Sequence, residues 1–307
     1  MPCHPPSWRV FLVLRLAKQQ ALSLSIFLAK TLWVFNRFHQ SVTPTEVIMR
    51  SSFLVLLFLL IFCAGSAQLF AATGHSAHGF DPGAYHLLLS ADPQTPKAGE
   101  QVAVTLKLTD AYGAPVSDFE IVHEKKLHLI IIRQGLDKFT HTHPEPGPDG
   151  TMTTSMTFPD GGTYYFYADF TPRGGKNVTL MAELGVDGDA SQAPPLDPYV
   201  PGKVQTDELL ADVGIEAGQG MHRVSFKLMD LTEAPVEDLQ PYLGAMGHFV
   251  VVSADGRQYV HSHPAGGGEA GEVVFEVHFP GPGIYKGWGE FQRGGSVLVV
   301  PVVMQID

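Results

Sequence analysis

Cysteine is almost missing from this chain of 307 residues. It has two, Cys3 and Cys63, and both precede residue 73. The part from residue 73 onward therefore contains no thiol, which excludes disulfide bridges, thiolate metal ligands and cysteine nucleophiles there. Its stability must come from packed cores, and any metal site in it must use histidine, methionine or carboxylate side chains. Its length is ample for two domains of ordinary size.

Positive charge is scarce as well. The chain has 20 Lys and Arg against 31 Asp and Glu. Residues 1–72 contain six of the basic residues and one of the acidic residues. Residues 73–307 therefore contain 14 basic and 30 acidic residues, which gives a formal charge of −16. Such a surface repels a phosphate backbone, which excludes nucleic acid as a partner. Residues 73–307 also lack a phosphate loop and a nucleophile elbow, so we expect binding and no enzyme activity.

Uninterrupted apolar runs long enough to span a membrane are missing too. The run Phe53–Cys63 is about half of the ~20 residues that a membrane helix needs. Arg50 before it and the small residues 64–67 after it are typical of a secretory signal peptide, which we place at 49–72. We interpret residues 1–48 as an upstream mis-start or an extension. The expected protein is periplasmic or secreted, with no transmembrane span in the mature chain.

Lipid attachment at Cys63 is an alternative for the same segment. Leu60 lies three residues before this cysteine, as in lipid-attachment sites. Phe62, however, is bulky at a position where such sites require a small residue. Soluble export is therefore the favoured interpretation.

What the chain does have is a repeat with a period of 120 residues. Three histidines of the first copy each have a counterpart in the second: His128 and His248, His141 and His261, His143 and His263. Flanking segments match as well, among them Gly162-Thr163-Tyr164 with Gly283-Ile284-Tyr285. A period of this length indicates two tandem copies of one domain, since the units of a solenoid are far shorter. We place the domains at 86–186 and 206–307, joined by a proline-rich, extended connector at 187–205.

Residues 73–307 have the pattern of an all-β protein. Segments of strand length, rich in β-branched and aromatic residues, are separated by Gly, Pro and Asp clusters. The expected strands are 102–108, 127–132, 152–158, 163–170 and 178–186 in copy one, and 222–229, 248–252, 259–263, 272–279, 284–291 and 297–306 in copy two. About seven short strands per domain predict two immunoglobulin-like β-sandwiches. Tyr164 and Tyr285, each after a glycine-rich turn, either form the tyrosine corner of such a sandwich or pack as ordinary strand residues.

The histidines are the residues most suited to chemistry. Residues i and i+2 of a strand point to the same face, so His141 projects with His143, and His261 with His263. A hairpin brings the start of one strand beside the end of the next, which predicts that His128 lies near His143 and His248 near His263. Three imidazoles at one end of a sandwich suit copper or zinc.

The two copies differ next to these histidines. Copy two has Met246 two residues before His248, whereas copy one has Lys126 at the matching position. A thioether beside imidazoles favours copper, including Cu(I), and an inward-pointing lysine would weaken metal binding. Copy two is therefore predicted to be the better copper site.

Two carboxylates in the repeat have alternative roles. Asp169 and Glu290 occupy matching positions and could add oxygen ligands. Each is followed by an arginine, Arg173 or Arg293, and a hairpin salt bridge is the favoured use. His123 and His128 form H-E-x-x-x-H, which is one residue longer than the helical zinc-protease motif and lies in a β context, so we exclude a metalloprotease.

The first copy also resembles a group of exported bacterial domains. The similarity rests on His128, the segment 139–144, Phe158-Pro159, Gly162-Thr163-Tyr164 and Ala168-Asp169-Phe170. These residues are similar to the YtkA-like and FixH-like families and, more loosely, to CopC-type periplasmic copper proteins, over about 95–186 and 215–306. The resemblance implies an immunoglobulin-like fold outside the cytoplasm and, in the copper branch, metal carriage.

Two functions are compatible with these observations. The first is an exported, non-catalytic protein that buffers or delivers copper, or zinc, through its histidine clusters. The alternative is an immunoglobulin-like module that interacts with an envelope protein partner, in which the histidines hydrogen-bond to one another and to the backbone.

Overall fold

The structure is a computed structural model that describes residues 70–71, 84–199, 203–218, 221–265 and 271–307, with the backbone alone at 70, 71, 261 and 263. Every described residue belongs to one compact unit, Leu69–Asp307. Apart from 70–71, the predicted signal peptide lies outside the described residues, as does all of 1–48. Within the described ranges, no helix has the length and apolar character needed to cross a membrane.

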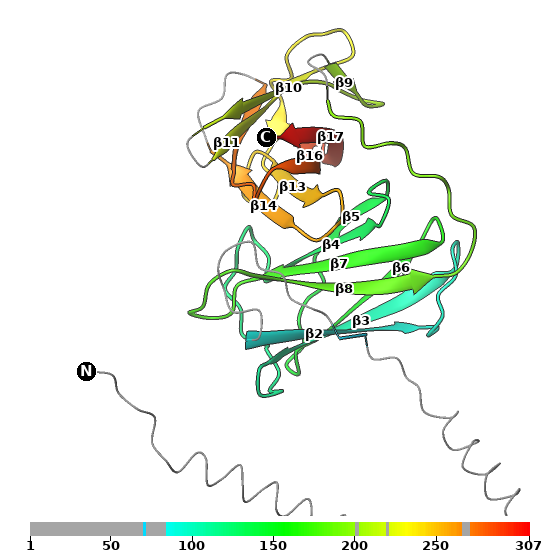
Figure 1. Ribbon diagram of the computed structural model, residues 1–307. Helices are drawn as coiled ribbons and strands as arrows, with labels where there is room; N and C mark the ends of the chain where they lie inside the picture. Colours follow the sequence, from blue (N-terminus) through cyan, green and yellow to red (C-terminus); the bar gives the residue numbers. More distant parts are fainter. Residues whose placement is uncertain (1–69, 72–83, 200–202, 219–220, 266–270) are drawn as a thin grey trace, which may run out of the picture. The chain divides into compact units, whose positions relative to one another are not determined.

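The first copy is a sandwich of two antiparallel sheets (Figure 1). One sheet has the strand order β1-β2-β3-β6, and the other has the order β5-β4-β7-β8. The strands are β1 (Phe70–Ala71), β2 (Tyr85–Asp92), β3 (Gln101–Asp110), β4 (Leu127–Arg133), β5 (Phe139–Thr142), β6 (Thr151–Thr157), β7 (Gly162–Phe170) and β8 (Val178–Val186). Three long strands facing four, with this order in each sheet, form an immunoglobulin-like sandwich.

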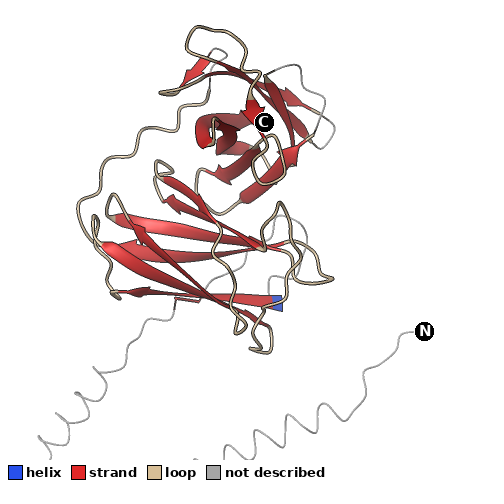
Figure 2. Cartoon of the chain, turned by 180° about the vertical axis from the view of Figure 1, so that it is seen from behind, coloured by secondary structure: helices blue, strands red, loops and turns tan. Residues whose placement is uncertain are grey.

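The second copy repeats this arrangement. Its strands are β9 (Lys203–Gln205), β10 (Leu210–Ala217), β11 (His222–Met229), β12 (Leu239–Gln240), β13 (His248–Ser253), β14 (Tyr259–Pro264), β15 (Glu272–Val277), β16 (Gly283–Arg293) and β17 (Ser296–Ile306). Here β14 pairs with β13 along its first half and with β15 at its end, so the two sheets join at this edge. Strands account for nearly all the regular structure (Figure 2). The prediction of two tandem immunoglobulin-like sandwiches is confirmed.

Both tyrosine corners are present. The Tyr164 hydroxyl donates to the carbonyl oxygen of Asp160 at 2.9 Å, and the Tyr285 hydroxyl donates to that of Gly281 at 2.9 Å. Each tyrosine lies near the start of its strand, β7 or β16, and bonds back four residues upstream. This is the tyrosine-corner geometry, and both rings also pack in the core of their sandwich.

Strand β4 is buried along its whole length because both of its faces are covered. Leu129 and Ile131 pack into the core between the two sheets of the first sandwich. Ile130 and Ile132 point the other way, into a third apolar cluster that includes Val250 of β13. The remaining buried members of this cluster are Leu136, Tyr165, Tyr167, Val252, Tyr259 and Trp288. The two sandwiches therefore meet through the outer faces of β4 and β7 on one side and β13 and β16 on the other.

The strand predictions succeed where alternation is clear and miss strands that are short or alternate weakly, such as β12, β2 and β10. The segments 178–186 and 222–229 are strands with the predicted limits. Strands β2 and β10 were missed, because their mixed burial patterns alternate weakly. The connector was predicted to contain no strand, but its end forms β9, which pairs with β10.

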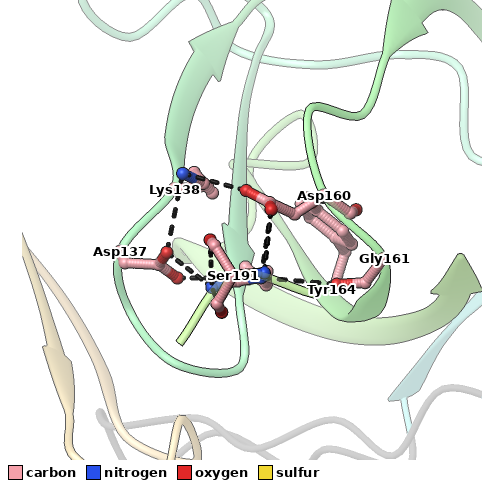
Figure 3. A network of polar contacts seen from close by, with 7 residues as sticks. Asp137, Lys138, Asp160, Gly161, Tyr164 and Ser191 are labelled. Atoms are coloured by element: carbon pink, nitrogen blue, oxygen red, sulfur yellow. Dashed lines mark hydrogen bonds and ion pairs between the residues drawn. The ribbon is translucent and has the colours of Figure 1, made fainter. Parts of the chain in front are cut away.

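A network of polar contacts that includes Asp137, Asp160 and Ser191 (Figure 3) surrounds Arg133 and ties the connector to the first sandwich. The Arg133 guanidinium, whose side chain is 5% exposed, bonds to both carboxylate oxygens of Asp137 at 2.8 and 2.6 Å. It also donates to the carbonyl oxygens of Ser191 and Gly161 at 2.7 and 3.4 Å. Asp160 accepts from Lys138 at 2.9 Å and from the Ser191 amide at 2.9 Å. Copy two has Ser253 in place of this arginine, so the network belongs to copy one alone.

The Asp160 carboxylate should make stability depend on acid pH. The hydrogen bond from Lys138, followed by that from the Ser191 amide, lowers the pKa of Asp160 to about 2. Because the folded pKa lies below the unfolded value, the stabilising contribution is complete above about pH 4 and is lost as the pH falls through about 2. We expect the difference in unfolding free energy between the wild type and Asp160→Asn, measured by urea unfolding, to shrink over that range. A difference that stays constant from pH 6 to pH 2 would contradict this assignment.

Candidate metal centre

Three histidines of the first sandwich converge on one point. His128 is the second residue of β4, His141 lies in β5, and His143 follows the end of β5. His128 Nδ1 is 3.1 Å from His141 Nε2 and 3.2 Å from His143 Nε2, and the last two nitrogens are 3.1 Å apart. The predicted proximity of His128 and His143 is confirmed. These three residues, called the triad below, are the one metal-ligand group found among the described residues.

The strand register explains this convergence. His141 lies opposite Ile130 in the β4–β5 pair, so the two side chains share a face of the sheet. His128 precedes Ile130 by two residues and therefore shares that face as well. This is the outer face, which packs against the second sandwich, and not the core side of the sheet. The triad thus lies toward one end of the hairpin, as predicted, but in the region between the two sandwiches.

Hydrogen bonds on the side of each ring that faces away from the other histidines determine which nitrogen carries the lone pair. His128 Nε2 is 3.0 Å from the carbonyl oxygen of Val122, which can only accept, so Nε2 carries the hydrogen and Nδ1 the lone pair. His141 Nδ1 donates in the same way to Glu290 Oε2 at 2.6 Å, which leaves the lone pair on Nε2. Both lone-pair nitrogens face the centre of the triad. A carboxylate or carbonyl behind a ligating imidazole is the usual outer support of a metal-bound histidine.

The spacing also fits a metal ion. Zinc–nitrogen bonds of about 2.0–2.1 Å in tetrahedral geometry separate neighbouring ligand nitrogens by about 3.3 Å. The separations of 3.1–3.2 Å in the triad are close to this value. Three imidazole nitrogens arranged in this way could hold copper or zinc and leave a fourth position for another ligand.

Burial keeps His143 neutral. His128 is 3% exposed, and the side chain of His141 is 1% exposed. The pKa of His143 is lowered to about 3, first by burial and then by the neighbouring imidazoles of His141 and His128 and by Lys125. Neutral imidazole is the form that binds metal, so the site needs no deprotonation of His143 at neutral pH.

The second copy is only partly described. His248 is completely buried, and its Nε2 donates to the carbonyl oxygen of Tyr242 at 2.9 Å, which matches the bond from His128 to Val122. His261 and His263 lie in β14, but their side chains are outside the described part of the chain. Met246 is 42% exposed. The preference for copy two as the better copper site therefore stays a prediction.

Lys126 of copy one does not point toward the histidines. Its side chain is 44% exposed and pairs with Glu145 at 3.6 Å, so it points to solvent. The lysine therefore does not place a cation among the histidines.

The salt bridges predicted for the two repeat carboxylates are wrong. Arg173 pairs with Asp118 at 3.2 Å and with Glu120 at 3.1 Å, and Arg293 pairs with Asp238 at 2.8 Å. Asp169 and Glu290 are instead almost completely buried. Asp169 accepts a hydrogen bond from Asn177 at 2.5 Å, and Glu290 accepts one from His141.

His123 is not among the predicted ligands, but its ring lies beside the histidines of both copies. His123 and Glu124 have φ angles of 48° and 62° in a tight turn between Val122 and Lys125. The His123 ring centroid is 5.1 Å from that of His248 and 6.2 Å from that of His128. Positive φ is uncommon for residues other than glycine and concentrates at functional sites. The excluded H-E-x-x-x-H motif thus has both histidines near the site, on a turn and a strand.

Comparison with solved structures finds remote similarity. A chain of the Escherichia coli adhesin FdeC is 18% identical, with 72% of this chain and 64% of that chain covered and a TM-score of 0.25. The bacterial integrin-binding protein invasin is 12% identical, with 72% and 39% covered and a TM-score of 0.21. The present chain thus spans less than two thirds of either. At these TM-scores the similarities carry no argument about function.

Comparison with curated proteins and with family models gives a clearer result. No curated protein matches the chain. One family model matches twice, over residues 82–188 and 206–307, and these ranges coincide closely with the two sandwiches. Since the two matches cover more than half of the chain, the protein belongs to the family described as Domain of unknown function (DUF8832), of which it carries two copies.

Proposed function

We propose that this protein binds a transition-metal ion, copper or zinc, through His128, His141 and His143. The observation that carries the proposal is the set of three nitrogen–nitrogen distances of 3.1–3.2 Å, together with the two outer hydrogen bonds that turn lone pairs toward the centre. Imidazole ligands suit Cu(II) and Zn(II), and no thiolate is available after residue 72.

The proposed role is buffering or delivery and not catalysis. A catalytic metal needs an open position that a substrate can reach. His128 and the side chain of His141 are at most 3% exposed, so the ion would be shielded on two sides. The signal-like segment 49–72 and the resemblance to exported copper proteins support the same role outside the cytoplasm.

The rival function is an immunoglobulin-like module that binds an envelope partner and uses the histidines structurally. In that case His143 Nε2 would carry a hydrogen and share it with the two lone pairs of His128 and His141. The fold itself is compatible with both functions, because one fold serves many unrelated activities.

Metal titration separates the two functions. The metal-free chain is titrated with Zn(II) and with Cu(II) by calorimetry, and the Cu(II) complex is examined by electron paramagnetic resonance. We expect a dissociation constant of about 1 µM or tighter and a spectrum with nitrogen hyperfine structure. Binding no tighter than millimolar for both ions would reject the metal function and support the interaction module.

A further inference from the structure

The metal centre is not contained in one sandwich. The carboxylate behind His141 is Glu290, which belongs to β16 of the second sandwich and is 149 positions further along the chain. The two side chains are 1% and 3% exposed, and the bond between them is 2.6 Å long. Glu290 lies opposite His248 in the β13–β16 pair, so it shares a face with that histidine. The ring centroid of His248 is in turn 6.3 Å from that of His128 and 6.4 Å from that of His141.

The contact is held by an apolar interface on the same faces of the sheets. Phe139 stacks on Trp288 with ring centroids 4.9 Å apart, and Tyr167 stacks on Tyr259 at 5.1 Å. The Tyr167 hydroxyl also donates to the carbonyl oxygen of Gly256 at 2.7 Å. The position of Glu290 behind His141 therefore depends on the docking of the second sandwich.

A buried carboxylate in this position has two effects on a metal site. It fixes the orientation of the His141 ring, and it makes the lone pair on Nε2 a stronger donor. Its own negative charge is almost excluded from water and is costly unless a positive charge lies nearby. A bound divalent cation, one imidazole away, supplies that charge. The ion and the second sandwich thus stabilise each other.

We propose that Glu290 is a positioning residue for the metal site of the first sandwich, and that metal uptake strengthens the docking of the second sandwich onto the first. This inference rests on the proposed function. It makes metal loading a regulator of the arrangement of the two domains, because a ligand that binds the docked form more tightly than the undocked form stabilises the docked form.

The test uses Zn(II) with the full chain and three variants. Glu290→Gln keeps an acceptor for His141 Nδ1 but removes the charge, and we expect its affinity for Zn(II) to fall about 10- to 100-fold. Glu216→Gln, an exposed carboxylate of β10 in the same sandwich, is the matched control and should bind as the wild type does. Tyr167→Phe removes a docking hydrogen bond in which no ligand takes part, and it should also weaken Zn(II) binding if docking and binding are linked.

Two further readouts distinguish positioning from general loosening. In the wild type, Zn(II) should slow amide hydrogen exchange in β13 and β16 of the second sandwich as well as in β4 and β5, whereas in Glu290→Gln the protection should be confined to the first sandwich. The Cu(II) resonance spectrum should change in Glu290→Gln and not in Glu216→Gln.

The possible failures point to different conclusions. Wild-type affinity in both Glu290→Gln and Tyr167→Phe, or Zn(II) protection of the first sandwich alone in the wild type, would overturn this inference and leave the proposed function standing. If the wild type itself binds no Zn(II) or Cu(II), the proposed function and this inference both fall.

Discussion

Replacing His141 and His143 together with alanine should lower the affinity for Zn(II) and Cu(II) by more than about 100-fold. Loss of a group that only hydrogen-bonds to a ligand lowers the metal affinity by about 10- to 100-fold. Loss of two ligands should lower the affinity further. The variant should fold, because His143 is only half-buried and β5 is a short edge strand. Calorimetric titration measures the change, and circular dichroism checks the fold.

The matched control is His86→Ala. His86 is an exposed histidine of β2 in the same sandwich, so its loss should leave the affinity unchanged. The corresponding double variant of copy two, His261→Ala with His263→Ala, tests the prediction that copy two is the better copper site. If only the copy-two variant lost tight binding, the triad of the first sandwich would be structural. If neither variant lost it, the histidines of both repeats would be excluded as the site.

Replacing Arg133 with methionine should destabilise the first sandwich by about 3–5 kcal/mol. The substitution keeps much of the volume but removes a guanidinium that bonds to both oxygens of Asp137, whose side chain is 7% exposed. Without the guanidinium, the buried Asp137 carboxylate keeps only a long ion pair of 3.7 Å with Lys138, whose side chain is 35% exposed, and a poorly compensated buried charge is costly. The substitution also removes the hydrogen bond that Arg133 donates to the carbonyl oxygen of Ser191 in the connector.

Urea unfolding measures this change, and Arg173→Met is the matched control. Arg173 makes two ion pairs, with Asp118 and Glu120, but its side chain is 61% exposed. Exposed pairs contribute about 0–1 kcal/mol, so the control should lose little stability. Equal losses in the two variants would show that burial of the Arg133 network has no special importance.

Much of the fold could be predicted because it is encoded locally and repeated. Strand segments such as 178–186 and 222–229 alternate in the sequence as they do in the structure. The corners at Tyr164 and Tyr285 follow from a glycine-rich turn before a strand. The approach of His128 to His143 follows from hairpin geometry, in which the start of one strand lies beside the end of the next.

Other features had no such signal. The apolar runs of β4 and β13 indicate strands buried on both faces, but nothing local shows that one face meets the other sandwich. Proximity along the sequence also predicts the wrong partners for the two carboxylates, because it pairs each with the nearest following arginine. Arg173 and Arg293 instead pair with Asp118 and Asp238, 55 positions away in each case.

The sequence by itself determined the all-β class, the duplication and the gathering of three histidines at one hairpin, since each depends on residue spacing within about 20 positions or on direct repetition. Only the tertiary structure decided that the triad faces the second sandwich and that Glu290 lies behind His141. The physical reason is that docking of two folded domains depends on the shape and burial of whole sheet faces. No periodicity in the chain encodes a contact between residues 149 positions apart.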